Sequence, residues 1–451
     1  MSSSVVVDGI RVKLMHRLEL CLRIRRMMTE AALGAAKAAI EAVLQDEANE
    51  RLGRERYEWR FLSRSGTTDW RCKGCGTNAG EDFGRNGVYR RNLALRQGLI
   101  SNLRVPRVRC QVCGSSIPAI FAVIEKYKRF WYDLTELALM EYGLSLSLRR
   151  IAAKLEKALG GISLSTLTSR IHSIEAGIWA WKNRPIEDVP DVVQLDGIWF
   201  SRMVPTGKRK RDKRGRLRMV KRRVARVVLV AVGIWTKSGK REILDWHVAS
   251  SESEDAWLHL LDRLYDRGLT GERGLRLIVH DGNGGVTSAL CYGYFDVLEQ
   301  RCIFHKIQNV ADGFRKEGGG SVEEITKDTS HVFKGKSKWA VKQRLWHFRK
   351  KWESRQPKSV RSLMSDFEKT LSYFDAGIDA VRFLRTTSQQ ERANRELRRK
   401  FDQMGVVQSE KGEQSAVHLA VLAYNYYAGD DDWTDIITDL YSSSLASLHT
   451  Q

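Results

Sequence analysis

Hydrophobic and polar positions change their spacing along this chain of 451 residues. Residues 11–60 carry apolar side chains near helical spacing and an alanine-rich run, which predict one long helix with a glycine cap. The segments 87–91 and 98–106 are short runs beside glycines that predict two strands. Helical spacing returns in residues 134–181. The first part of the chain therefore predicts a helix, a small β unit and a second helical region.

The second half of the chain predicts a mixed sheet with helices on its faces. Three consecutive strand patterns precede alternating helix and strand patterns, which is the order expected for such a sheet. The predicted strands are 192–200, 224–235, 241–248, 275–280 and 300–304, and the predicted helices are 254–267 and 285–297. Residues 312–385 predict a polar helical segment, in which Trp339, Trp346 and Trp352 form one core-facing side.

Charge narrows the class of partner. The chain has 76 Lys and Arg against 54 Asp and Glu, a formal net charge of +22, and such an excess suits a polyanion. Ribosomal proteins and proteins of membrane surfaces share this balance, so charge alone does not select nucleic acid. No segment approaches ~18 uninterrupted apolar residues, and residues 1–10 lack a signal-peptide pattern. We expect a soluble, cytoplasmic protein without a membrane partner.

Four of the seven cysteines form two Cys-x-x-Cys pairs. Each pair is followed by glycine, which accommodates the tight turn around metal-bound sulfurs. The long segment between the pairs contains the two predicted strands, which would bring the pairs together. This pattern favours metal binding over disulfides, with redox thiols as the alternative. It predicts one structural Zn²⁺ ion held by Cys72, Cys75, Cys110 and Cys113.

Two acidic residues stand at the ends of predicted strands. Asp196 ends the run that begins at Val192, and Asp281 follows the apolar run from Leu275 to Val279. Carboxylates from separate elements hold the paired Mg²⁺ or Mn²⁺ ions of phosphodiester-cleaving sites, with the ions about 3.5–4 Å apart. Both acids precede glycine, and Asp-Gly also favours a simple turn. The acids therefore predict either a metal site at one sheet edge or two turns.

Two later motifs favour the metal site. The string Gln300-Arg301-Cys302-Ile303-Phe304-His305-Lys306, the later Thr386-Thr387-Ser388-Gln389-Gln390-Glu391 and the two acids together resemble the catalytic core of Mutator-like DDE transposases of bacterial insertion sequences. The similarity runs from about residue 40 to 425. It implies an RNase H-like core, with the first Asp on the first strand, the second on the fourth, and a Glu on a helix after a variable insertion.

The resemblance also implies roles for three further residues. The family pattern Thr-Thr-Asn-x-Ile-Glu falls on residues 386–391, with two departures, and implies Glu391 as the third metal ligand and Glu396 as runner-up. Glu391 also suits a helical ion pair in this basic stretch. Cys302 and His305 are implied to lie beside the active site, where His305 contacts the scissile phosphate or orients an acid. A buried thiol and a satisfied histidine are the alternative.

Three segments are expected to contact DNA. A basic stretch between the first two core strands predicts a mobile phosphate-binding hairpin, although a solvated loop has the same composition. The helix patterns 146–158 and 163–176, with Ser163 as N-cap, fit a helix-turn-helix or a plain helical hairpin. The β unit resembles the family's basic β segment. The expected contacts are Lys208, Arg209, Lys210, Arg211, Arg214 and Arg216, then Ser165, Thr166 and Arg170, and finally Arg90 and Arg91.

The expected protein is multidomain α+β, with an RNase H-like mixed α/β catalytic core interrupted by a helical insertion and preceded by helical and zinc-ribbon-like DNA-binding domains. The expected parts are an N-terminal helical region (1–60), a zinc-ribbon-like β domain (61–130), a helix-turn-helix-like domain (131–185), the first part of the core (186–311), the insertion (312–385) and the final helical part with the tail (386–451).

The resemblance implies a DNA transposase. Such an enzyme binds the terminal inverted repeats of its element, cleaves the ends by metal-dependent hydrolysis and transfers the 3′-hydroxyl ends into target DNA. It acts on double-stranded DNA as a homodimer or larger assembly and is nucleoid-associated. Two other interpretations stay open, a metal-dependent DNA nuclease and a non-catalytic zinc-containing DNA-binding protein derived from a transposase.

Overall fold

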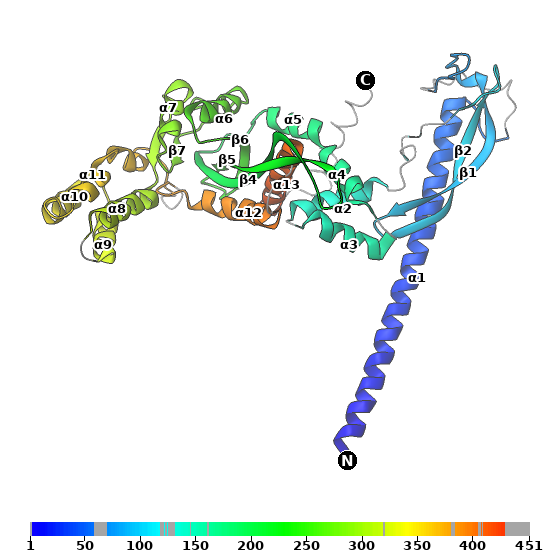
Figure 1. Cartoon of the computed structure of the whole chain (residues 1–451), viewed down its shortest axis with the longest axis horizontal. Coiled ribbons are helices and arrows are strands. Elements are labelled where there is room, and N and C mark those ends of the chain that lie inside the picture. Colours follow the sequence, from blue (N-terminus) through cyan, green and yellow to red (C-terminus); the bar gives the residue numbers. More distant parts are fainter. Residues whose placement is uncertain are drawn as a thin grey trace. The chain divides into compact units, whose positions relative to one another are not determined.

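The computed structural model describes residues 2–57, 70–117, 121, 124, 131–144, 146–159, 162–318, 321–379, 384–404, 407 and 409–428, with 2–20 as backbone only. The chain divides into two compact units, whose elements are labelled in Figure 1. The first contains Met1–Ala138 and Arg149–Leu167, and the second contains Leu139–Leu148 and Thr168–Gln451. The predicted β unit and the predicted core therefore belong to different units.

The first unit packs a helix against a small antiparallel sheet. Helix α1 (Ser2–Leu52) ends where Gly53 adopts a left-handed φ of 65°, so the predicted helix stops earlier than residue 60. Its last turns bury Leu44, Ala48 and Leu52, spaced four residues apart, in the core of this unit. The sheet has the order β1-β2-β3, with β1 (Phe83–Leu95), β2 (Gly98–Cys110) and β3 (Ser116–Ile117). Both predicted strands are confirmed and are longer than expected.

Four short helices follow the β unit: α2 (Tyr132–Gly143), α3 (Leu148–Leu159), α4 (Leu164–His172) and α5 (Glu175–Asn183). Ser163 caps α4 as predicted, because its Oγ accepts a hydrogen bond from the Thr166 backbone nitrogen at 3.1 Å. The predicted helix over 163–176 is wrong at its end, since Ser173 donates its hydroxyl to the Arg170 carbonyl at 2.8 Å and α4 stops there. None of the described helices is long and apolar enough to cross a membrane.

The second unit contains a five-stranded mixed sheet of order β6-β5-β4-β7-β8. β4, β7 and β8 run parallel, whereas β5 is antiparallel to both of its neighbours. The predicted succession of three strands followed by alternating helix and strand is confirmed, and the fold is mixed α+β. The strands are β4 (Val192–Arg211), β5 (Leu217–Ile234), β6 (Arg241–Ala249), β7 (Leu277–His280) and β8 (Leu298–Arg301).

Helices cover both faces of this sheet (Figure 1). Val193 and Leu195 of β4 belong to the core formed with α6 and α7, whereas Gln194 and Asp196 contact α12 on the other face. Because successive side chains of a strand point to opposite faces, β4 can bury apolar residues on one side and direct polar ones to the other. These helices are α6 (Glu254–Asp266), α7 (Gly284–Gly293), α12 (Ser388–Met404) and α13 (Glu410–Ala428).

β4 and β5 continue beyond the sheet as a two-stranded ribbon, residues 203–223, which we call the basic ribbon. The prediction that these strands stop at 200 and restart at 224 is wrong, because backbone pairing extends to Arg211 and Leu217. Because its residues are mostly lysine and arginine, this segment lacks the alternation of apolar and polar side chains that predicts a strand. An exposed ribbon needs only backbone hydrogen bonds to form. At its base, Arg202 and Arg226 pair with the buried Glu413 of α13 at 2.7 and 3.4 Å.

A helical segment separates β8 from α12. It contains α8 (Ile303–Glu317), α9 (Val322–Val332), α10 (Lys338–Trp352) and α11 (Pro357–Met364). The predicted tryptophan face is wrong for Trp339 and Trp346, which are 72% and 55% exposed, although Trp352 is buried. The buried side of α10 has spacings of four, three and four residues, which the tryptophan spacing does not match. It consists of Val341, Leu345, Phe348 and Trp352.

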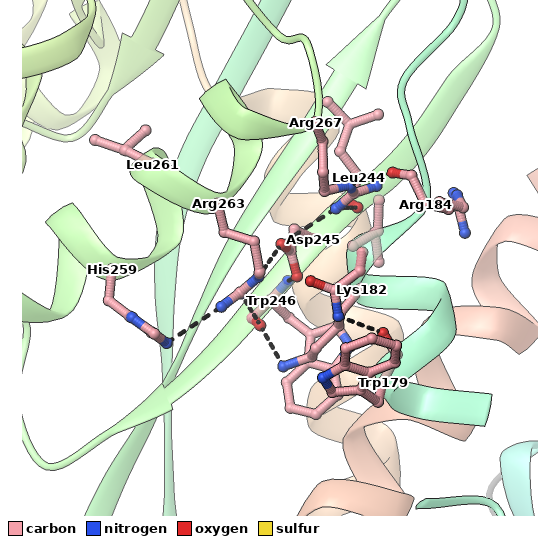
Figure 2. A network of polar contacts seen from close by, with 12 residues as sticks. Trp179, Lys182, Arg184, Leu244, Asp245, Trp246, His259, Leu261, Arg263 and Arg267 are labelled. Atoms are coloured by element: carbon pink, nitrogen blue, oxygen red, sulfur yellow. Dashed lines mark hydrogen bonds and ion pairs between the residues drawn. The ribbon is translucent and has the colours of Figure 1, made fainter. Parts of the chain in front are cut away.

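A buried charged network joins α5, β6 and α6 (Figure 2). Asp245 of β6 is fully buried, and its Oδ2 accepts hydrogen bonds from Arg263 Nε at 2.6 Å and Arg267 Nη1 at 3.2 Å. Lys182 of α5 donates to the Trp246 carbonyl at 3.0 Å and lies 3.4 Å from the centre of the Trp246 ring. The chain itself therefore supplies the cations that neutralise this acid.

Candidate functional site

Three residues of the predicted site form one row across the parallel strands. His280 of β7 pairs with Leu195 of β4 on one side and with Arg301 of β8 on the other. The next residues along the three segments are Asp196, Asp281 and Cys302. Because parallel strands in register place equivalent residues side by side, the structure brings both acids and the cysteine to the same edge of the sheet.

The two Asp-Gly steps differ in structure. Asp196 does not end a strand, contrary to the sequence prediction, because β4 continues to Arg211. Gly197 lies within β4, where a Cβ would come 2.6 Å from Glu252 Oε1. Gly282 lies after the end of β7 and has a φ of 87°. Glycine therefore admits a neighbouring carboxylate at the first step and permits a left-handed backbone at the second.

Asp196 is largely buried, and other acids lie around it. Its Oδ2 accepts a hydrogen bond from Asn394 Nδ2 at 2.6 Å, and its Oδ1 accepts one from the Gly197 backbone nitrogen at 2.8 Å. Burial and the charge of Asp281 raise the pKa of Asp196 to about 6, although the Gly197 hydrogen bond and the charge of His305 lower it. Among the described residues, no lysine or arginine pairs with Asp196. Such a site favours a bound cation.

Cys302 and His305 lie beside the acids. The buried Sγ of Cys302 accepts hydrogen bonds from the Thr387 backbone nitrogen at 3.4 Å and from Thr387 Oγ1 at 3.5 Å. The hydrogen bond with Cys302 and the charges of Asp196 and Asp281 raise the pKa of His305 to about 8, against the effect of burial. His305 Nδ1 is buried without a partner in the described part of the chain. A protonated His305 at this edge can bind an anionic oxygen.

Gln194 and Asn394 are site residues that the sequence analysis missed. Gln194 is fully buried; its Nε2 donates to the Thr386 carbonyl and its Oε1 accepts from the Gln390 backbone nitrogen, both at 2.9 Å. The Gln390 side chain donates in turn to Asn394 Oδ1 at 3.1 Å. These bonds hold the first turns of α12 against β4. A glutamine inside an otherwise apolar strand is the signal that could have found Gln194.

The first turn of α12 carries Glu391, the proposed third acid. Glu391 precedes Asn394 by three residues and is half-buried. Residues three apart are neighbours on a helix surface, so Glu391 lies next to the side of α12 that contacts Asp196. It is not among the charges that shift the pKa of Asp196 most. Glu396 instead pairs with Arg399 and lines a separate cavity. Of the two candidates, Glu391 is on the side nearer the acids.

Glu252 is a further carboxylate at this edge, and no motif pointed to it. Its Oε1 accepts a hydrogen bond from Trp199 Nε1 at 2.7 Å, and its Oε2 accepts one from Asn283 Nδ2 at 2.9 Å. Burial and the charge of Asp281 raise the pKa of Glu252, although the bond from Trp199 lowers it. Glu252 lies in the loop before α6, so only the tertiary structure brings it to the acids.

The four predicted zinc ligands gather in one cluster. Their Sγ atoms all lie within 4.8 Å of one another, with separations of 3.4 Å between Cys72 and Cys113 and 3.5 Å between Cys75 and Cys110. A tetrahedral centre with Zn–S bonds of about 2.3 Å requires S···S distances of about 3.8 Å. All four cysteines are free. The cluster therefore fits a zinc ion.

The two cysteine pairs have the same backbone geometry. The Gly76 nitrogen donates to the Cys72 carbonyl at 2.9 Å, and the Gly114 nitrogen donates to the Cys110 carbonyl at 3.0 Å. Both glycines have left-handed φ angles, of 81° and 76°. Cys110 also ends β2, where it pairs with Phe83 of β1. The β1-β2 hairpin thus brings together two pairs that are far apart in sequence.

The residues expected to contact DNA are exposed to different degrees. Asp212, an acid within the basic ribbon, accepts hydrogen bonds from the Arg214 and Arg216 backbones and from Arg218 Nε at 2.6 Å, so it serves the turn. Arg90 is exposed opposite Arg104, a like-charge pair that a bound polyanion would relieve. Exposed are Lys208, Arg209, Lys210, Arg211, Arg214, Arg216, Ser165 and Arg90; half-exposed are Thr166, Arg170 and Arg91.

The chain belongs to the Mutator family of transposases. The family described as "Transposase, Mutator family" matches residues 22–433, which is most of the chain. The family resemblance seen in the sequence is therefore confirmed.

Its relatives are transposases of insertion sequences. The transposase of IS406 from Burkholderia multivorans is 31% identical over 320 residues, covering 70% of this chain and 74% of the relative. The transposase of IS256 in transposon Tn4001 from Staphylococcus aureus is 28% identical over 317 residues, covering 70% and 74%. The transposase of IS905 from Lactococcus lactis subsp. lactis is 22% identical over 352 residues, covering 78% and 82%.

Proposed function

We propose that this member of the family is a DDE transposase whose catalytic acids are Asp196, Asp281 and Glu391. It binds the terminal inverted repeats of its element, cleaves the ends by hydrolysis and transfers the 3′-hydroxyl ends into target DNA. The row of Asp196 and Asp281 at one sheet edge carries this proposal. In chain order, Asp196 lies on the first strand of this sheet, β4, and Asp281 follows the fourth, β7, which supports an RNase H-like core.

The donor set suits two Mg²⁺ or Mn²⁺ ions. Carboxylate oxygens are the ligands that these hard cations prefer, and Asp196 is largely enclosed near Asp281, with no lysine or arginine of the described structure paired with it. When bound, such ions activate the attacking oxygen and stabilise the leaving oxygen of an in-line displacement. Asp196, Asp281 and Glu391 would hold them. Asn394 orients Asp196, and protonated His305 binds a non-bridging oxygen of the scissile phosphate.

Both steps exchange one phosphate ester bond. In cleavage, a water oxygen attacks the phosphorus, the bond from phosphorus to O3′ breaks, and the element keeps a 3′-hydroxyl while the flank keeps a 5′-phosphate. In joining, that 3′ oxygen attacks a target phosphorus, and the target O3′ leaves with a proton. No protein nucleophile takes part, so the residues of this chain only bind, orient and transfer protons.

The basic parts of both units supply DNA contacts in this proposal. The basic ribbon projects from the sheet on the side where β4 continues past Asp196, so its cations track the phosphates that flank the cleaved bond. The α3–α4 pair and the Arg90 strand bind the terminal repeat, with Ser165, Thr166 and Arg170 towards a groove. Because two ends must be held together, we propose at least a homodimer.

Conservative substitutions of the two candidate glutamates test the site. Purified protein is mixed with DNA carrying the inverted repeats that flank the gene, with Mg²⁺ or Mn²⁺, and both cut and joined products are measured. We expect Glu391→Gln to lose both products while end binding persists, because a metal-holding carboxylate is gone. Glu396→Gln is the matched control on the same helix, and it should cut and join normally, because Glu396 lies on another side of α12.

The same assay separates the alternatives. If Glu396→Gln loses activity and Glu391→Gln keeps it, the third catalytic acid is Glu396 and not Glu391. Cutting without joining, even with pre-cut ends, would identify a nuclease. End binding with no metal-dependent cutting by the wild type would contradict catalysis and leave a DNA-binding protein derived from a transposase.

We also propose that the four-cysteine cluster holds structural zinc that the DNA-binding region needs. The double variant Cys72→Ser and Cys110→Ser should lose the bound zinc and weaken end binding, because the two substitutions together remove one ligand from each pair. Zinc content is measured by elemental analysis of the purified protein. Cys21→Ser, at an exposed cysteine outside the cluster, is the matched control. Native protein without zinc would refute this role.

A further inference from the structure

Trp199 is a large, half-exposed aromatic side chain at the edge of the sheet, on the opposite face of β4 from Asp196 and in contact with Glu252. It lies on β4 three residues after Asp196, and 51% of it is exposed. Its neighbour across the strands is Val227, which is fully buried, so the strand around it is well ordered in the core. An indole at such a place exposes an apolar face where a polar surface is expected. An exposed indole at this position is therefore a candidate binding surface.

The edge of the Trp199 ring is held in place. Trp199 Nε1 donates to Glu252 Oε1 at 2.7 Å, and the other oxygen of Glu252 accepts from Asn283 Nδ2 at 2.9 Å. The Glu252 backbone is closely packed as well, since a Cβ at Gly285 would come within 2.6 Å of its carbonyl oxygen. Asn283 stands two residues after Asp281. This chain of contacts ties the ring to the loop that carries the second acid.

Both oxygens of Glu252 are thus engaged by neutral donors. A carboxylate used in this way orients its partners, and we assign it the role of a positioning residue rather than a metal ligand. It holds the Nε1 edge of the Trp199 ring, while about half of the residue stays exposed to solvent. A fixed, open indole face next to a polar site is suited to a flat aromatic ligand.

We propose that Trp199 is a stacking platform for an unpaired nucleobase next to the scissile phosphate, held in position by Glu252. This inference rests on the proposed function. Bases inside a duplex have both faces covered by their neighbours, so only a terminal base or one turned out of the helix can cover the indole. Every base has a π face, so such a platform accepts any sequence. It would hold the strand end while the acids act on the adjoining phosphate.

A fluorescent base tests this contact. The probe is a short duplex with a single-stranded 3′ overhang whose last base is 2-aminopurine, whose emission falls on stacking. It is titrated with full-length protein without added divalent ion, so that no cleavage intervenes. We expect the wild type to quench the probe, and Trp199→Leu to leave it bright and to bind it roughly 5- to 100-fold more weakly. Trp199→Phe should restore most quenching, because its ring still stacks.

Trp339→Leu is the matched control, since Trp339 is also exposed but lies on α10, away from the acids. It should quench and bind as the wild type does. Glu252→Gln should bind the probe with reduced quenching, because glutamine has one acceptor oxygen in place of two and cannot accept from both Trp199 and Asn283, so the ring is less firmly held. A blunt duplex with 2-aminopurine in its interior should be bound without quenching in every variant.

The results distinguish this inference from the proposed function. If Trp199→Leu quenches as strongly as the wild type while both cut and join DNA ends, the platform is wrong and the transposase proposal stands. If Trp199→Phe behaves like Trp199→Leu, an aromatic face is not what matters, and the stacking proposal is likewise overturned. Failure of the wild type to cut or join any end counts against the proposed function instead.

Discussion

Asp196 and Asp245 are two acids of the same sheet that differ in their hydrogen-bond partners; Asp245 is fully buried and Asp196 largely so. Asp245 on β6 accepts hydrogen bonds from Arg263 and Arg267, so the chain neutralises it. Asp196 on β4 accepts hydrogen bonds from the amide groups of Asn394 and Gly197, and the charges of Asp281, Glu252 and His305 act on it. A buried charge is costly unless it is paired. The contrast separates an acid that the chain pairs with its own arginines from one that it leaves without such a partner, as the proposed metal site requires.

The largest expected effect is on chemistry at Asp196. Asp196→Asn should lower the rate of end cleavage by roughly 10³-fold or more, because losing a metal-holding carboxylate removes several kcal/mol of transition-state stabilisation. The protein should stay folded, since an amide in this place is no longer a buried charge. Cleavage is followed on gels with end-labelled DNA, and circular dichroism checks the fold. Normal cleavage by this variant would mean that Asp196 is not a catalytic acid.

Asp245→Asn, in contrast, should lower the free energy of unfolding of the protein. Removing this acid's charge leaves the buried Arg267 and the half-buried Arg263 without their anionic partner, at a cost of about 3–5 kcal/mol. The free energy of unfolding is measured by urea titration. Asp262→Asn, at an exposed position on the same helix as Arg263, is the control and should change stability by no more than about 0.5 kcal/mol. An unchanged Asp245→Asn midpoint would remove the distinction between the two acids.

Divalent ions should stabilise the wild type through the acid row. Mn²⁺ at about 100 times its dissociation constant should add about 2.7 kcal/mol, because it binds only the folded site. Thermal unfolding is recorded with and without Mn²⁺. Asp196→Asn should lose this gain, whereas Asp262→Asn should keep it. Equal gains in Asp196→Asn would place the ion elsewhere in the protein.

The smallest expected effect is the pH dependence of the Asp245 network. Burial lowers the pKa of Lys182 to about 7, although the charge of Asp245 raises it. Between that value and its ordinary pKa near 10.5, the unfolded chain binds more protons, so stability should rise with pH in this window by roughly 1 kcal/mol per pH unit. Lys182→Met, which keeps apolar contact with Trp246, should remove that part of the slope. Urea titrations at pH 7 and pH 9 measure it.

Structural features that depend on a few neighbouring residues could be predicted from local sequence patterns. Two Cys-x-x-Cys-Gly segments predict two equivalent turns, and both glycines do adopt the left-handed φ that such turns use. The order of strands and helices follows from hydrophobic spacing alone. The basic ribbon was predicted as a mobile hairpin between strands that end at 200 and restart at 224, because its own strands lack a buried face and so show no alternation.

The side of a helix that packs against the rest of the protein could not be predicted from residue spacing alone. Glu391 and Glu396 lie on one basic helix, and both suit an ion pair when seen in sequence. The bonds from Gln194 and Asp196 to α12 fix which side of the helix meets the sheet, and that side lies next to Glu391. Likewise, Trp339 and Trp346 looked like core residues until the packing of α10 placed Val341 and Leu345 inward.

The sequence by itself determined the family, the mixed α+β fold, the four-cysteine cluster and the two neighbouring acids, because each depends on a motif or a periodicity short enough to read along the chain. Only the tertiary structure decided that Glu252, Trp199 and Asn394 join those acids, and that Asp245 does not. Their contacts join segments tens to hundreds of residues apart, and no local pattern encodes which acid receives an arginine and which does not.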